Sequence, residues 1–369
     1  MQPNSTSEPL ERPVSPVSGA GQQSNPTWQA QNEQLAAFSG NTAEYFRIWA
    51  VNICLTLVTF GLYSSWAKVR NQQYFARHTS IGEHSFDYHG DPLAIFKGRL
   101  VMGTFFALLM LSQSYSPVLY LLLILALVVA SPWLIVKAMA FHTRNHSYRN
   151  VRFSFRGSVS GAYLVSLKGF LAYFFTLGLG LPYWQYTQTE FIVENVQFGD
   201  QKFRFKTPIA DYFIAFVLMI ACYVPAMTVL ICSVIGGVFG GGLPNGLGEI
   251  IMVGGILLGY ALMLLPVAFM KARMANLLYN GMEVGEHTFL ESSQVTLELL
   301  KLYLVNAVAV VFTFGLATPW VKVRMARYRC ETLKVHNANF LVAEVSPDDD
   351  VGALGDAASD FGDFGLELG

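Results

Sequence analysis

The stretch TFGLYSSWAKVR, residues 59–70, recurs near the other end of the chain as TFGLATPWVKVR, residues 313–324, with eight of twelve positions identical. In each copy an apolar run ends at a glycine, Gly61 or Gly315, and the chain restarts with small or proline residues, a tryptophan and basic residues. Glycine just after a helix and proline in the first turn of the next are ordinary stop and start signals. The stretch therefore predicts an apolar helix, a break and a shorter helix with a basic exposed side, and its recurrence predicts an internal repeat.

Three weaker copies lie between these two, at residues 176–183 (TLGLGLPY), 131–133 (SPW) and 265–266 (LP). An alternating, mostly aromatic segment follows each restart, 21 residues after Ser65 or the proline in four copies and 23 residues after Pro266. Alternation with a period of two indicates short β-strands. The predicted strand segments are Phe86–Gly90, Phe153–Gly157, Phe203–Phe205, Phe289–Glu291 and Phe340–Val342.

The composition indicates that lipid surrounds much of the chain. Charged residues make up 13% of the 369 residues, against about 25% in an average soluble protein, and the mean hydropathy is +0.40. Most of the apolar runs approach the ~17–25 residues that a membrane-spanning helix needs. The seven runs are residues 46–63, 100–115, 118–136, 169–185, 212–235, 250–270 and 302–318. We therefore predict an all-α polytopic membrane protein of about seven transmembrane helices, with internal repeats and short aromatic β-strand elements between the helices.

The two ends of the chain differ in composition from the part between them. Residues 1–34 are rich in Pro, Ser, Gln and Asn, and residues 345–369 are acidic and contain neither Lys nor Arg. Segments with so few large apolar residues cannot bury enough surface to become ordered. We expect two disordered tails, 1–34 and 345–369, around a repeat-built transmembrane domain of residues 35–344.

The distribution of Lys and Arg predicts an orientation. If each apolar run crosses the membrane once, the segments on one side contain 16 Lys and Arg residues and those on the other contain 8. The positive-inside rule then places the N-terminus outside and the C-terminus in the cytoplasm. Under this topology Asp87 is cytoplasmic and Gln201 lies outside. The alternative keeps every strand on the cytoplasmic face, with the first, third and last units as re-entrant hairpins; we prefer seven crossings.

Several motifs together resemble a known family. They are FSG (38–40), EYFRIW (44–49), TFGLYSSWAKVRNQQYFARHTSIG (59–82), FDYHG (86–90) and TPWVKVRMARY (318–328). They resemble the YjgN-like bacterial inner-membrane family, a domain of unknown function (number 898), over about residues 35–344. The resemblance implies a polytopic inner-membrane protein and supplies no catalytic or binding residues. Ser65 departs from the pattern, because the better copies have proline there.

Asn52 and Asn306 occupy equivalent positions, seven residues before Thr59 and Thr313, within apolar runs. An amide in lipid needs a hydrogen-bond partner. One interpretation is a hydrogen bond between helices, which we favour; the other is a pair that lines a polar pathway through the membrane.

The basic short helices are the most suggestive surface, because they combine aromatic residues with cations at the membrane boundary. Aromatic residues favour that interface, and a cation near anionic lipid contributes about 1 kcal/mol. The residues are Trp66, Lys68, Arg70, Trp320, Lys322 and Arg324. They either anchor the topology or form a site for anionic lipid headgroups or another anionic ligand.

Other kinds of site are not indicated. The apolar runs have no charged residue at their centres, which counts against an ion-coupled pump. His142 and His146 are four residues apart, but nearby arginines would repel a metal ion. We expect no catalytic centre, no metal and no cofactor, and a net charge of −1 gives no reason to expect nucleic acid.

Two functional hypotheses follow. The first is a transporter or permease, because the preferred topology divides the chain into two halves of opposite orientation, as in many transporters. The second is a non-transporting membrane scaffold that binds lipid, anionic lipid in particular, or a protein partner.

Overall fold

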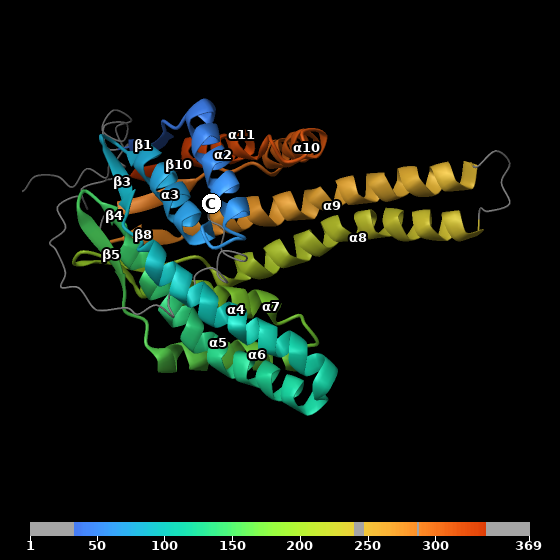
Figure 1. The fold of residues 1–369 in the computed structure, drawn as a ribbon, viewed down its shortest axis with the longest axis horizontal. Helices are drawn as coiled ribbons and strands as arrows, with labels where there is room; N and C mark the ends of the chain where they lie inside the picture. Colours follow the sequence, from blue (N-terminus) through green and yellow to red (C-terminus); the bar gives the residue numbers. More distant parts are fainter. Residues whose placement is uncertain (1–32, 240–246, 286–287, 337–369) are drawn as a thin grey trace, which may run out of the picture. The chain divides into compact units, whose positions relative to one another are not determined.

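Pairs of helices alternate with short strands along the part of the chain that the structure describes (Figure 1). The computed structural model describes residues 33–239, 247–285 and 288–336, and the structural statements below concern these residues. The pairs are α2 (Thr42–Val58) with α3 (Ser64–His78), α4 (Pro92–Tyr115) with α5 (Pro117–Asn145), α6 (Val159–Phe175) with α7 (Leu181–Glu194), α8 (Ile209–Phe239) with α9 (Leu247–Asn280), and α10 (Thr296–Phe312) with α11 (Thr318–Glu331).

The strands form a closed antiparallel barrel, so the prediction of an all-α fold is wrong. β1 (Glu33–Phe38) pairs with both β10 (Leu333–His336) and β2 (Thr79–Ile81), and this closes the barrel. The remaining strands are β3 (His84–Tyr88), β4 (His146–Tyr148), β5 (Val151–Phe155), β6 (Val196–Phe198), β7 (Gln201–Phe205), β8 (Met282–Val284) and β9 (Thr288–Ser292). Each three-residue strand was too short to give an alternating pattern in the sequence.

Four of the predicted aromatic segments are strands, namely β3, β5, β7 and β9. The fifth, Phe340–Val342, lies outside the described residues. The described strand β10 pairs with β1, from the opposite end of the chain. β1 begins at Glu33 and therefore includes two residues that the sequence assigned to the N-terminal tail.

The interior of the barrel is filled by apolar side chains. The third residue of each short strand is at most 8% exposed; these residues are Ile81, Tyr148, Phe198, Val284 and Val335. Three of them lie opposite an aromatic residue of the neighbouring long strand, in the pairs Phe86–Tyr148, Phe153–Phe198 and Phe203–Val284. Burial of aromatic side chains is a large source of stability, so the barrel is a packed core.

Four described helices, not seven, are long and apolar enough to cross a membrane. These spans are Pro92–Tyr115, Pro117–Asn145, Ile209–Gly237 and Gly248–Asn280. Figure 1 shows α8 and α9 side by side, extending away from the barrel. The other three apolar runs, 46–63, 169–185 and 302–318, each pass through a tight turn, so each contributes the tip of a short helical hairpin rather than one crossing.

The repeated TFGL motif encodes that turn. Phe60 and Gly61 have positive φ angles of 50° and 90°, and the N–H of Gly61 donates to the carbonyl of Thr56 at 2.7 Å. The hydroxyl of Thr59 accepts a hydrogen bond from the N–H of Tyr63 at 3.0 Å. Glycine tolerates such angles without steric cost. The sequence indicated the role of the glycine but not that of the threonine.

The barrel also overturns the predicted topology. Every helical pair starts from the barrel and returns to it, so Asp87 in β3 and Gln201 in β7 lie on the same side of any membrane that the helices enter. The first and last described residues, Glu33 and His336, are paired across β1 and β10 and cannot lie on opposite sides. The side of the membrane on which each strand lies is decided by pairing between distant strands. A count of Lys and Arg along the chain contains no information on that pairing.

Candidate functional site

The helices that begin after the TFGL turns of the first and last pairs carry the predicted basic and aromatic residues. From α2 to α11, consecutive helices of the chain pack against each other, and α11 also packs against α2. The structure therefore brings the first and last units next to each other, with α2 in contact with both α3 and α11. The two basic helices therefore pack against the same helix, α2, although about 250 residues separate them in the sequence.

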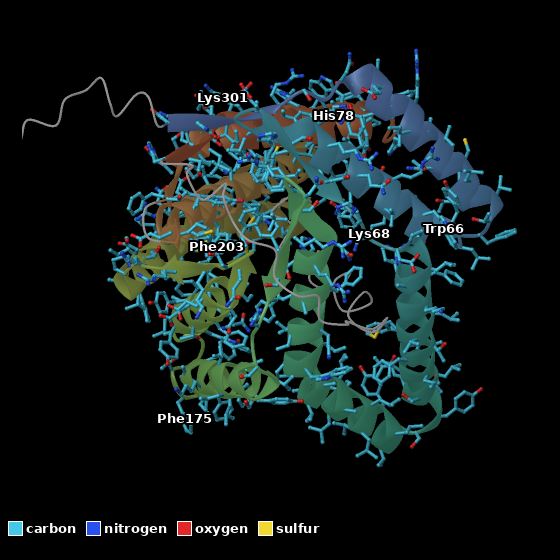
Figure 2. The ribbon with its side chains drawn as sticks, turned by 90° about the vertical axis from the view of Figure 1, so that its left-hand side faces the viewer. Trp66, Lys68, His78, Phe175, Phe203 and Lys301 are labelled. Carbon is cyan, nitrogen blue, oxygen red and sulfur yellow. The ribbon has the colours of Figure 1, made fainter. Side chains whose placement is uncertain are left out.

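At the start of α3, aromatic rings support the basic residues. The Trp66 ring stacks on Tyr63 with centroids 6.2 Å apart and also contacts Phe96 of α4 at 5.9 Å. Arg70 donates from Nη1 to the Tyr63 hydroxyl at 3.3 Å. Lys68 is half-buried on the same helix, and Figure 2 shows it near Trp66. Tyr63 therefore orients this group, a role that the sequence did not indicate.

At the start of α11, the cation lies over the tryptophan itself. The Arg324 guanidinium carbon is 5.0 Å from the centroid of the Trp320 ring, which is a cation–π contact. Trp320 is 37% exposed and Lys322 is also exposed. Arg324 additionally donates from Nη1 to Oδ1 of Asn306 at 3.5 Å, a long and weak hydrogen bond. This arrangement presents a flat ring and two cations at one helix start.

The two predicted amides are buried, at 3% exposure for Asn52 and 5% for Asn306. Asn52 donates from Nδ2 to Oδ1 of Asn71 on α3 at 3.3 Å, and Asn306 accepts from Arg324 on α11. Each amide thus hydrogen-bonds to the second helix of its own pair rather than to the other amide. In both pairs the amide therefore joins the two helices of the pair by a hydrogen bond.

The third helical pair has no amide at the position that Asn52 and Asn306 hold in the first and last pairs. Gly169 holds the corresponding position on α6, and the Trp184 ring of α7 lies directly against it. A Cβ atom on Gly169 would collide with that ring. In the third pair a tryptophan therefore takes the place of the polar contact at this position.

The histidines of α5 and β4 pack together. The rings of His142 and His146 stack with centroids 4.8 Å apart, and the Tyr88 ring meets His146 edge-on at 5.1 Å. Burial, and secondly the neighbouring His142 and His89, lower the pKa of His146 to about 3. Within residues 33–239, 247–285 and 288–336, no group of three or more His, Cys, Asp or Glu residues is arranged to hold a metal ion.

These features define a class: a polytopic membrane protein whose helical pairs start from a closed barrel and carry basic and aromatic residues at the starts of α3 and α11. The chain belongs to the family described as bacterial protein of unknown function (DUF898), whose profile matches residues 33–361. This confirms the family resemblance of the sequence motifs.

Curated relatives share part of the chain. The inner membrane protein YjgN of Escherichia coli O157:H7 is 31% identical over 144 residues, which cover 39% of this chain and 36% of that protein. YjgN of Escherichia coli strain K12 is 30% identical over 144 residues, with the same coverage of the two chains. YjgN of Salmonella typhimurium strain LT2 is 28% identical over 127 residues, 34% of this chain and 32% of that protein. The matches thus span about a third of the length of these relatives, and no solved structure matches the chain.

Proposed function

We propose that the protein is an inner-membrane protein that binds anionic lipid headgroups at the starts of α3 and α11, and that its role is to organise lipid rather than to catalyse a reaction. One observation carries the proposal: Arg324 lies over Trp320, Lys322 is exposed on the same helix, and the adjacent unit repeats this composition at Trp66, Lys68 and Arg70. Cations held beside interfacial aromatic rings attract the phosphate groups of lipids. The relatives named inner membrane protein YjgN support the inner membrane as the location.

The fold supports an orientation with the barrel in the cytoplasm. The residues that connect the two helices of each spanning pair in the sequence, Ser116 and residues 240–246, include none of the 24 Lys and Arg residues. Because the helical pairs return to one barrel, the basic residues gather on the barrel side, and the positive-inside rule assigns that side to the cytoplasm. The leaflet next to the barrel is then the anionic cytoplasmic one, which matches the charge of the two basic helix starts.

The transport hypothesis loses its main argument. It rested on two halves of opposite orientation, each with three crossings. The described helices contain four spans, in two pairs that both start from and return to the same barrel. We therefore favour lipid binding.

The test measures the lipids that co-purify with the protein, by native mass spectrometry. Replacing Lys68, Arg70, Lys322 and Arg324 by Gln should reduce bound anionic phospholipid severalfold, because the cations that neutralise the phosphate are removed while the packed barrel is untouched.

A control variant removes the same number of charges from exposed arginines and lysines of the barrel strands and the adjoining loop: Arg152→Gln, Arg156→Gln, Lys202→Gln and Arg204→Gln. This variant should retain the lipids of the unaltered protein. Equal loss of lipid from both variants, or no loss from the first variant while its helical content is unchanged, would refute the proposal.

A further inference from the structure

The tips of the three short helical pairs are bare apolar surfaces. Phe60 is 97% exposed, Leu177 is 95% exposed and Phe314 is 97% exposed, each at the corner of its turn. Around these corners the neighbouring side chains are also apolar and exposed: Leu57, Val58, Leu62, Phe174, Phe175, Leu179, Val311, Phe312 and Leu316. Figure 2 shows Phe175 at the outer edge of the molecule. Such patches on a surface in water favour aggregation or mark a binding surface. We therefore expect another apolar phase or molecule to cover these tips.

The turns are built to sit in hydrocarbon. At the first tip the N–H groups of residues 60, 61, 62 and 64 donate to backbone carbonyls, and that of Tyr63 donates to the Thr59 hydroxyl. The third and fifth pairs repeat all five bonds, with Thr176 and Thr313 in the place of Thr59. A backbone N–H without a partner costs several kcal/mol in lipid. A turn whose amide protons are all bonded within the chain does not incur that cost.

The apolar ends of the short pairs are too short to cross a bilayer. From Arg47 to the end of α2 at Val58 is 11 residues, which is about 16 Å of helix. The corresponding stretch of α10, from Lys301 to Phe312, has the same length, and Lys168 lies seven residues, about 10 Å, before the end of α6. Half of the ~30 Å hydrocarbon core is about 15 Å. On the returning helices, Lys68 and Lys322 follow the helix starts Ser64 and Thr318 by only four residues, about 6 Å. The tips of the short pairs therefore enter one leaflet without crossing the bilayer, and these cations stay close to its headgroups.

We propose that the protein is a membrane wedge: α2–α3, α6–α7 and α10–α11 insert into the barrel-side leaflet alone, while α4–α5 and α8–α9 cross both leaflets. Ten described helices then occupy the barrel-side leaflet and four occupy the opposite one. A protein with a larger cross-section in one leaflet is favoured where that leaflet is on the convex side. We infer that the protein accumulates in curved membrane whose convex side faces the barrel, and that it promotes this curvature.

The wedge is independent of the anionic-lipid site proposed above, and the test separates them by using vesicles of phosphatidylcholine alone. A version without the four native cysteines carries Lys202→Cys on β7, an exposed barrel residue. An impermeant fluorophore added from outside labels only the molecules whose barrel faces outward. A narrow tube is then pulled from a giant vesicle, and the ratio of protein fluorescence to membrane dye is compared between the tube and the vesicle.

The expected result is about twofold enrichment in the tube, growing as the tube narrows, because insertion at an interface is curvature-sensitive. The variant Phe60→Ser, Leu177→Ser and Phe314→Ser should return the ratio toward one, and it removes no contact inside the folded protein because all three side chains are exposed.

The matched control alters exposed residues at the tip of a spanning pair, Tyr115→Ser and Val118→Ser, which are 84% and 69% exposed. These residues lie beyond the barrel-side leaflet, so the enrichment should persist in this variant. A ratio of one for the unaltered protein, or enrichment that the three tip substitutions leave unchanged, would overturn the inference. Enrichment in phosphatidylcholine would stand even if anionic lipid proved not to bind.

Discussion

His146 should make the folded protein sensitive to mild acid, and replacing it by Phe should remove that sensitivity. Its ring lies between His142 and Tyr88, and its Nε2 is shielded from solvent without a hydrogen-bond partner among the described residues. Burial lowers the pKa of this imidazole to about 3 in the folded protein. An unfolded chain protonates histidine near pH 6.5.

The direction in which stability changes with pH follows from proton binding. Between pH 6.5 and pH 3 the unfolded chain binds a proton at His146 that the folded protein does not bind, so the folded state loses stability as the pH falls. The full contribution of His146 to the free energy of unfolding is present above about pH 6.5. At pH 5, about 1.5 units lower, the loss is about 2 kcal/mol, since one pKa unit corresponds to about 1.4 kcal/mol.

The assay is denaturant unfolding of the protein in nanodiscs at pH 7.5 and pH 5. The unaltered protein should lose about 2 kcal/mol more than His146→Phe, whose ring keeps the contact with Tyr88 but cannot titrate. His84→Phe, at an exposed ring, serves as the control and should behave as the unaltered protein does. If His146→Phe loses as much stability as the unaltered protein over this pH interval, the buried neutral imidazole is not the cause and the reasoning is refuted.

Two further predictions concern topology and packing. In a version without native cysteines, single cysteines at Asp87 and Gln201 should both be protected from an impermeant reagent outside the cell, whereas one at Ser116 should react; unequal labelling at the two barrel positions would contradict the closed barrel. Gly169→Ala should lower the unfolding free energy by about 1–3 kcal/mol, because the new methyl group meets the Trp184 ring; a more stable variant would show that the ring moves without cost.

The sequence alone located the elements that carry local signals. Four aromatic strands, the break at Gly61 and Gly315, and the four long spans all follow from periodicity, composition and turn chemistry, which act over a few residues. The family also followed from motifs in the sequence. For the candidate site, the basic and aromatic residues were identifiable, but their supports, Tyr63 and Asn71, were not. Those contacts depend on how one helix lies against the next.

Only the tertiary structure decided how often the chain crosses a membrane and which segments meet. Hydropathy measures the transfer of a segment into lipid, and an apolar run that contains a tight turn scores much like one that crosses, so the prediction of one crossing each for residues 46–63, 169–185 and 302–318 is wrong. The pairing of β1 with β10 joins residues about 300 positions apart, and no local propensity encodes such a contact. Closure of the barrel satisfies the hydrogen bonds that edge strands would otherwise expose, and that requirement places all strands on one side of the helices.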